Sequence, residues 1–278
     1  MKQKSIGPLL QRYELKYLIH RSMVEPISQF ASIYCSLDKY SQISADNTYI
    51  VNSLYFDSPG YLFLKKRLEG EDNRFNMRVR TYGYDKNQPV FLEIKYKSGS
   101  ILCKYRAKVN SSDYPSIITD GCFLPQEEDS SKENKNINLF MKLAHTYIAE
   151  PKVLIQYKRK AFVSRYDQYA RITFDKNLCY KRQGGYSCVP EPEELLHCSD
   201  EFTFPSDEDV VLELKCYTSQ VPLWMLDLIR TFDLHRSSFS KYLAGMREVY
   251  ENRLYDFNDR QSTIHNHLKE ASNAAHSF

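Results

Sequence analysis

Patterns with a period of two run along eight segments of this chain, and in six of them charged side chains alternate with apolar ones, as where Arg78 and Arg80 alternate with Met77 and Val79. Successive side chains of a β-strand point to opposite faces of a sheet. The alternation therefore predicts strands near residues 11–19, 47–57, 73–83, 89–98, 100–109, 152–165, 168–176 and 209–218. Eight strands suffice to close a barrel, and the short turn 97–100, which contains Gly99, is typical of an antiparallel hairpin. We predict an α+β fold of mainly antiparallel strands, closed into an eight-stranded β-barrel that forms a tunnel.

Helical periodicity appears in residues 22–34, 138–149, 222–232 and 240–250, and we expect these helices to pack outside the barrel. Two polar and acidic stretches are expected to be surface loops, residues 110–137 and 183–208. A chain of 278 residues can fold around one core. We predict one domain, residues 1–256, followed by a polar C-terminal tail, residues 257–278.

The charge balance limits what the chain as a whole can bind. It has 38 Lys and Arg against 35 Asp and Glu, unlike a basic nucleic-acid arm or a polybasic membrane anchor. No run of about 18 apolar residues is present to span a bilayer. The seven cysteines form an odd number without a CxxC pair, which fits a reducing compartment. We predict a cytoplasmic protein without nucleic acid and without a membrane segment of its own.

The charged face of these strands has two interpretations. For any single strand, a face in contact with water is the simpler one. Against it, the spacing Glu-x-Lys recurs at Glu14, Glu93 and Glu213, and arginine, whose planar group matches phosphate, is prominent on the same face. A cation-rich interior would repel itself when empty, by about 4 kcal/mol for two charges about 4 Å apart at an effective dielectric constant of about 20. A polyanion with a divalent cation would relieve that repulsion.

Nine short motifs in this order resemble the polyphosphate polymerase (VTC) domain family of the triphosphate tunnel metalloenzyme superfamily. They are RYELKY (12–17), SLYFDSPGY (53–61), MRVRTYG (77–83), FLEIKYK (91–97), KYRAK (104–108), YKRKAF (157–162), ARITFD (170–175), VLELK (211–215) and FSKYLAG (239–245). The resemblance extends over residues 12–245. It implies a CYTH-like antiparallel tunnel that binds a nucleoside triphosphate and threads polyphosphate.

The resemblance also implies roles for individual residues. Those expected to act on the transferred phosphate are Lys16, Arg78, Arg80, Arg159, Arg171 and Lys241. Those expected to bind the remaining phosphates are Lys95, Lys104, Arg106 and Lys215. Glu213 resembles the glutamate that binds Mn²⁺ or Mg²⁺. Glu93 and Glu14 are further metal candidates for which an ion pair with a neighbouring Lys or Arg is an equal alternative, and Asp175 could pair with Arg171.

The chain departs from the family pattern in two places, and one residue of the motifs does not fit the strand alternation. Hydrolytic members of the superfamily carry ExExK in the first strand, whereas here Arg12 replaces the first Glu, which favours transfer to phosphate over hydrolysis. Ser237 and Ser238 stand where eukaryotic polymerases have a further Lys, a change that could lower activity or shift the substrate. Strict alternation groups Arg159 with Tyr157 on the apolar face, so a bulge or a register slip is expected there.

The leading hypothesis is an ATP-dependent polyphosphate polymerase, which transfers the γ-phosphoryl group of ATP to a growing inorganic polyphosphate chain. A metal-dependent triphosphatase of the same fold and a non-catalytic polyphosphate or nucleotide sensor are the alternatives. The resemblance also implies that a membrane partner could take up the product. The lone Trp224 is interpreted as part of the apolar stripe of a covering helix.

Overall fold

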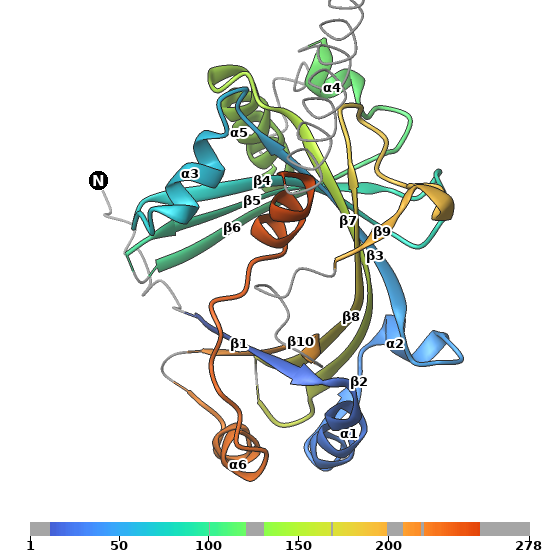
Figure 1. Ribbon diagram of the computed structural model, residues 1–278, viewed down its shortest axis with the longest axis vertical. Coiled ribbons are helices and arrows are strands. Elements are labelled where there is room, and N and C mark those ends of the chain that lie inside the picture. The colour runs from blue at the N-terminus through green and yellow to red at the C-terminus, as the bar shows by residue number, and fades with distance from the viewer. Residues whose placement is uncertain are drawn as a thin grey trace, which may run out of the picture.

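The computed structural model describes residues 12–99, 101–120, 131–167, 169–198, 208–217 and 220–250. In this part the chain forms one strongly curled antiparallel sheet with helices around it (Figure 1). Its strands are β1 Arg12–His20, β2 Cys35–Leu37, β3 Tyr49–Asp57, β4 Arg74–Tyr82, β5 Val90–Ser98, β6 Ile101–Val109, β7 Glu150–Ser164, β8 Ala170–Arg182, β9 Leu196–His197 and β10 Glu208–Tyr217. All eight predicted strands are present, and the short strands β2 and β9 are additions to them.

The helices are α1 Val24–Ser32, α2 Lys39–Ile43, α3 Leu62–Leu68, α4 Ser116–Thr119, α5 Lys132–Thr146 and α6 Leu223–Thr231, with 3₁₀ turns at Arg21–Met23 and Pro192–Glu194. Residues 241–250 are also helical. The expectation of an irregular loop over 110–137 was wrong in part, because α5 begins at Lys132, where the Ser131 hydroxyl accepts the N–H of Asn134 at 3.2 Å. The predicted tail, residues 257–278, lies outside the described residues.

The strand order of the sheet is β1-β10-β8-β7-β3-β4-β5-β6. Every described pairing is antiparallel, as predicted, but no backbone ladder among the described residues joins β1 to β6 at the two ends of this order. The closed barrel is therefore not confirmed, and the sheet is a curled half-barrel with a concave and a convex face. Right-handed strand twist bends such a sheet around without closing it.

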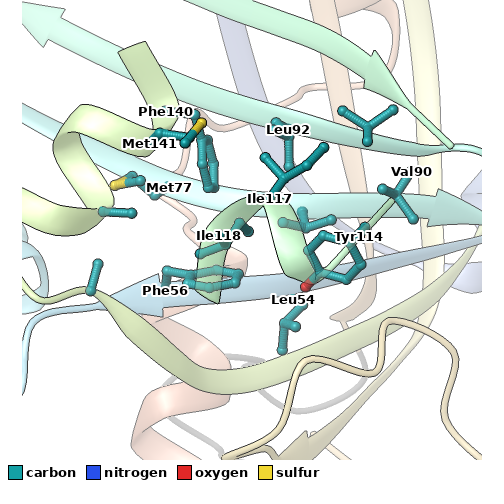
Figure 2. Close-up of a cluster of buried hydrophobic side chains, with 14 of the residues drawn as sticks. Leu54, Phe56, Met77, Val90, Leu92, Tyr114, Ile117, Ile118, Phe140 and Met141 are labelled. Atoms are coloured by element: carbon teal, nitrogen blue, oxygen red, sulfur yellow. The ribbon is translucent and has the colours of Figure 1, made fainter. Parts of the chain in front are cut away.

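The convex face carries two apolar cores that the outer helices cover. On one side, Met77 and Val79 of β4 and Leu92 of β5 pack with Phe140 of α5 (Figure 2). On the other, Ile172 of β8 and Leu214 of β10 pack with α1 and α6. Trp224 of α6 belongs to this second core and lies stacked on Tyr34, which confirms its interpretation as a packing residue.

A third core lies on the concave face and corrects the expected position of the last helix. Residues 241–250 were expected to pack outside, but Tyr242 and Met246 pack against Tyr55 of β3 and Ile155 of β7. Figure 1 shows this helix within the curl of the sheet. Gly245 permits the close approach, because a Cβ atom at this position would lie 2.4 Å from Cδ1 of Ile155.

Asp57, at the end of β3, holds this last helix in place. Its buried carboxylate accepts the backbone N–H groups of Phe63 and Leu64, both at 2.9 Å, at the start of α3. It also accepts the hydroxyl of Tyr242 at 2.6 Å. Neighbouring positions on the helix, including Lys241, are thereby brought over the concave face.

Candidate functional site

The concave face gathers nine cations around four carboxylates within ion-pair distance. The cations are Lys16, Arg78, Arg80, Lys95, Lys104, Arg106, Arg159, Lys215 and Lys241, and the carboxylates are Glu14, Glu93, Asp175 and Glu213. They come from β1, β4, β5, β6, β7, β8, β10 and the last helix. The charged face of the strands is therefore the concave one, and the apolar residues that alternate with it form the convex cores.

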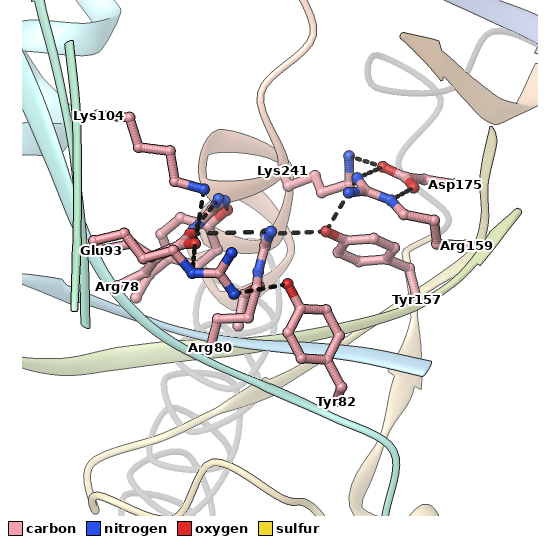
Figure 3. Close-up of polar contacts among 12 residues, drawn as sticks. Arg78, Arg80, Tyr82, Glu93, Lys104, Tyr157, Arg159, Asp175 and Lys241 are labelled. Carbon is pink, nitrogen blue, oxygen red and sulfur yellow. Dashed lines mark hydrogen bonds and ion pairs between the residues drawn. The ribbon is translucent and has the colours of Figure 1, made fainter. Parts of the chain in front are cut away.

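The first group of charges, the arginine wall, lies on β4–β6 around Glu93. Arg78 donates to Glu93 Oε2 through Nε at 2.8 Å, and Lys104 Nζ lies 2.7 Å from Oε1 (Figure 3). Arg106 Nε lies 3.3 Å and Arg80 Nη1 3.9 Å from the same carboxylate. The three strands place these side chains at facing register positions, because Glu93 is paired with Arg78 on one side and with Arg106 on the other. One buried anion thus holds four cations together.

The second group, the glutamate wall, lies on β1 and β10. Lys215 Nζ lies 2.7 Å from Glu213 and 3.4 Å from Glu14, so these two carboxylates flank one ammonium group. Lys16 Nζ lies 3.6 Å from Glu213 and donates to the backbone oxygen of Phe239 at 2.8 Å. Lys95 reaches from β5 to pair with Glu14. This side-chain contact spans the concave face where no backbone ladder does.

The third group, the Asp175 cluster, lies between the two walls. Arg159 of β7 donates to both oxygens of Asp175, at 2.6 and 2.7 Å. Lys241 from the last helix lies 2.6 Å from the same carboxylate (Figure 3). Asp175 therefore pairs with Arg159 and Lys241, and not with Arg171 as the sequence suggested. Through this contact, Lys241 of the last helix lies over the concave face of the sheet.

The cations keep the buried carboxylates ionised. Burial by itself raises the pKa of a carboxyl group. For Glu93, attraction to Arg78, Arg80 and Lys104 outweighs burial and holds the pKa well below its usual range. For Glu213, burial is likewise outweighed by Lys215 and Lys16. The concave face therefore carries fixed negative charges as well as positive ones, with positive charge in excess.

Burial lowers the pKa of two lysines of the concave face, Lys16 and Lys104, towards neutral pH. Burial lowers the pKa of Lys16 from 10.5 to about 8, despite the attraction of Glu213. Lys215 behaves in the opposite way, because Glu213 and Glu14 together outweigh its burial and raise its pKa. Two lysines of the same wall thus respond differently to pH.

Glu213 and Glu14 are the carboxylates best placed to hold a divalent cation. These two carboxylates share three lysines, Lys16, Lys95 and Lys215, whereas Glu93 alone is surrounded by four cations and Asp175 alone by two. Within the described ranges, no three His, Cys, Asp or Glu side chains gather as a ligand set for a metal. Mg²⁺ and similar ions are commonly bound by one or two carboxylates together with phosphate oxygens and water. The two glutamates fit an ion that arrives with a phosphate ligand.

Twelve of the thirteen residues suggested by the resemblance have a place in the three groups on the concave face, and Arg171 is the exception. Arg171 lies on β8, opposite Lys215 in the register, with an exposed side chain whose guanidinium is 5.9 Å from the ring centroid of Tyr169. Arg171 shares the face of Asp175 but lies four residues before it in the strand.

Tyr157 is a residue of the site that the sequence interpretation assigned to the wrong face. Its hydroxyl accepts Nη2 of Arg80 at 3.1 Å and of Arg159 at 3.4 Å. Arg159 and Tyr157 both lie on the concave face, so the side chains of β7 alternate between the two faces without interruption here. The register shift occurs in its pairing with β8, near Asn177, which has a φ of 53°.

Two further side chains hold the arginines of β4. Tyr55 accepts Nη1 of Arg78 at 3.0 Å, and Ser53 accepts Nε of Arg80 at 3.2 Å. Both lie on β3 directly opposite the arginine that they contact. The period-two alternation of β3 could have placed Ser53 and Tyr55 on one face of the sheet. The sequence does not show which residues of β4 lie opposite them, because that depends on the strand register.

The chain is similar to known proteins over most of its length. The family model described as the VTC domain matches residues 11–250. Vacuolar transporter chaperone complex subunit 4 of Schizosaccharomyces pombe is 25% identical, over 73% of this chain and 32% of that protein. The protein of the same name from Trypanosoma brucei brucei is 26% identical, over 63% of this chain and 25% of that protein. The chain thus aligns with a third or less of the length of these relatives.

Solved structures with a related chain path have low sequence identity. A putative adenylate cyclase from Bacillus halodurans has a TM-score of 0.46 and 11% identity, over 82% of this chain and 92% of that one. A putative adenylyl cyclase from Hippeastrum, described as having a dominant triphosphatase activity, has a TM-score of 0.45 and 13% identity, over 86% of this chain and 96% of that one.

In the part of the chain that the structure describes, no helix has the length and apolar character needed to cross a membrane. The family model extends from β1 through the last described helix, so it includes every strand that contributes to the charged concave face. On this match the chain belongs to the VTC domain family.

Proposed function

We propose that this chain is an ATP-dependent polyphosphate polymerase whose concave face binds the triphosphate and the growing chain. The observation that carries the proposal is the excess of nine cations over four carboxylates on one face of a nearly neutral protein. Inorganic phosphate chains are dense linear anions, and arginine binds their oxygens through two donors at once. Membership of the VTC domain family supports this assignment.

In the proposed reaction, a terminal oxygen of the polyphosphate chain attacks the γ-phosphorus of ATP. The bond from the γ-phosphorus to the bridging oxygen breaks, and ADP leaves with the electron pair. Such transfers depend on alignment and on neutralising the equatorial oxygens more than on a strong base. We assign the neutralising role to Arg78, Arg80, Arg159, Arg171 and Lys241.

The arrangement of these cations suits that role. Arg78 and Arg80 are held by Tyr55, Ser53 and Glu93, so their orientation is fixed before a ligand binds. Preorganised charges cost little reorganisation during the reaction. We assign binding of the remaining phosphates along the face to Lys16, Lys95, Lys104, Arg106 and Lys215.

We further propose that Glu213 and Glu14 hold Mn²⁺ or Mg²⁺ together with phosphate oxygens. Such an ion, when bound, would withdraw charge from the triphosphate. Arg12 stands where hydrolytic relatives of the superfamily carry a further Glu, and one carboxylate fewer favours transfer to phosphate over activation of water. Cytoplasmic location and a membrane partner that takes up the product remain predictions. That the named relatives are subunits of a chaperone complex supports a search for partners.

The test is to incubate the purified chain with ATP and Mn²⁺ and to separate the products by gel electrophoresis and nucleotide chromatography. We expect polyphosphate ladders together with ADP. ADP with free phosphate and no ladder would assign the triphosphatase activity instead. A folded sample that binds triphosphate but yields neither product would favour the non-catalytic sensor. A folded sample that binds no triphosphate would contradict the proposal.

A further inference from the structure

Four aromatic rings gather at one end of the concave face. They belong to Tyr40 of α2, Tyr49 of β3, Tyr82 of β4 and Phe91 of β5, and we call them the aromatic group. The ring centroid of Tyr40 lies 5.5 Å from that of Tyr49 and 5.9 Å from that of Tyr82, and Tyr82 lies 5.7 Å from Phe91. The rings of Tyr40 and Tyr82 are nearly parallel, at 6°. The four rings are therefore one continuous group.

The position of this group follows from the antiparallel strands. Tyr49 is at the start of β3, Tyr82 at the end of β4 and Phe91 near the start of β5, so the three residues meet at one end of the sheet. Counting by two along each strand places them on the concave face, with Ser53, Arg80 and Glu93 respectively. The rings thus continue the charged face at one end.

Arg106 joins the aromatic group to the arginine wall. Its guanidinium carbon lies 3.8 Å from the ring centroid of Phe91, and its Nη2 donates to the hydroxyl of Tyr82 at 3.3 Å. Its Nε lies 3.3 Å from Glu93. Arg80 is two residues from Tyr82, a spacing of about 7 Å along a strand. A ligand whose phosphates contact Arg80 and Arg106 therefore has the aromatic group within reach of its next chemical unit.

We propose that the aromatic group binds the base of the nucleoside triphosphate, an inference that rests on the proposed function and adds the position of the nucleoside. A purine ring is flat, and stacking on aromatic side chains requires no particular hydrogen-bonding pattern. Tyr40 is 44% exposed and forms the outer edge of the group. Lys39 lies 4.9 Å from its ring centroid and Arg106 borders the opposite side. With these two cations at its borders, the aromatic group is better suited to the flat ring of a nucleobase, which has polar edges, than to an apolar side chain.

The first experiment uses the unmodified chain. Calorimetric titration compares ATP with ribose 5′-triphosphate, which keeps the phosphates and the sugar and lacks the base. We expect ATP to bind on the order of 10-fold more tightly, the range that base stacking on an aromatic ring supplies. Equal affinities would overturn the inference and leave the proposed function intact. No binding of either ligand, nor of inorganic tripolyphosphate, would instead overturn the proposed function.

The second experiment changes Tyr40 itself. Tyr40→Ala is expected to weaken ATP on the order of 10-fold and to leave tripolyphosphate unchanged, and Tyr40→Phe is expected to retain the affinity for ATP. The matched control is Tyr13→Ala, because Tyr13 is 45% exposed and lies on the other face of β1 from Glu14 and Lys16. An equal loss for ATP and tripolyphosphate in Tyr40→Ala, or an equal loss of ATP binding in Tyr13→Ala, would overturn the inference.

Discussion

The arginine wall and the glutamate wall face each other across the same curled sheet, yet their charge ratios differ. On β4–β6, four cations surround the single carboxylate of Glu93. On β1 and β10, two carboxylates, Glu14 and Glu213, are interleaved with Lys16, Lys95 and Lys215. The first wall has spare positive charge for an anion, whereas the second is closer to balance and carries the oxygens that a cation needs. One basic face can therefore offer two separate sites, with cations for phosphate on the arginine wall and carboxylates for a metal ion on the glutamate wall.

The largest effect is expected from removing the spare charge of the arginine wall. The double variant Arg78→Ala with Arg80→Ala removes one part-buried and one buried guanidinium group, to which we assign phosphate binding, each worth about 1.5–3 kcal/mol as a charge-assisted donor. We expect affinity for tripolyphosphate, measured by calorimetry, to fall by roughly 100-fold or more.

The matched control is Lys86→Ala with Lys181→Ala, which removes two cations paired with Glu191 and Glu194 outside the charged face. Circular dichroism must show that both double variants fold. This check matters most for the Arg78/Arg80 variant, in which Glu93 loses two of its four partners. Unchanged affinity in a folded Arg78/Arg80 variant would mean that phosphate is not held by the arginine wall.

An intermediate effect is expected from Glu213→Gln on the glutamate wall. Without metal, tripolyphosphate should bind this variant at least as tightly as the unmodified chain, because a negative charge has been removed. With Mn²⁺, the gain in affinity that the unmodified chain shows should shrink by about 10-fold, as expected for one lost charged contact.

Glu93→Gln is the comparison for this experiment, since it removes a carboxylate from the other wall. It should keep the effect of Mn²⁺ on tripolyphosphate binding. A loss of that effect in Glu93→Gln and its retention in Glu213→Gln would reverse the roles of the two walls.

The smallest effect is a pH dependence that belongs to Lys16. Its pKa is lowered to about 8, so the ammonium group is charged at pH 7 and largely neutral at pH 9. Affinity for tripolyphosphate should therefore decrease several-fold between these pH values, and this part of the decrease should be absent in Lys16→Met. Lys104, whose pKa is lowered to about 7, titrates in the same direction in both proteins.

The stability of the free protein should change in the opposite sense. The unfolded chain binds a proton at Lys16 up to about pH 10.5, whereas the folded chain releases it near pH 8. Between these values the unfolded state binds more protons, so the contribution of Lys16 to stability rises with pH. Chemical denaturation of the ligand-free chain and of Lys16→Met across this range measures the difference. A contribution that falls with rising pH would contradict the lowered pKa.

The sequence predicted which residues make up the site, but not which of its charged side chains pair with one another. Alternation assigned Arg78, Glu93 and Lys215 to one face, because the period of two is a local property of an extended backbone. It could not show that Arg78 and Lys104 share one carboxylate, since this depends on the register of three strands. It also could not identify Tyr157, whose phenol ring appeared apolar and whose hydroxyl reaches Arg80 across the intervening strand β3.

The sequence by itself determined the eight main strands, their mainly antiparallel arrangement with one hairpin at residues 97–100, the residues of the charged face and the family. These features rest on the local period of the backbone and on the order of short motifs. Only the tertiary structure decided that no backbone ladder joins β1 to β6 in the described part of the chain, and that residues 241–250 return to the concave face. Strand twist sets how far a sheet curls, and the contacts of Gly245 and Tyr242 with β7 and β3 join residues far apart in the chain. No local pattern encodes such contacts, because their free energy exists only once both partners are folded.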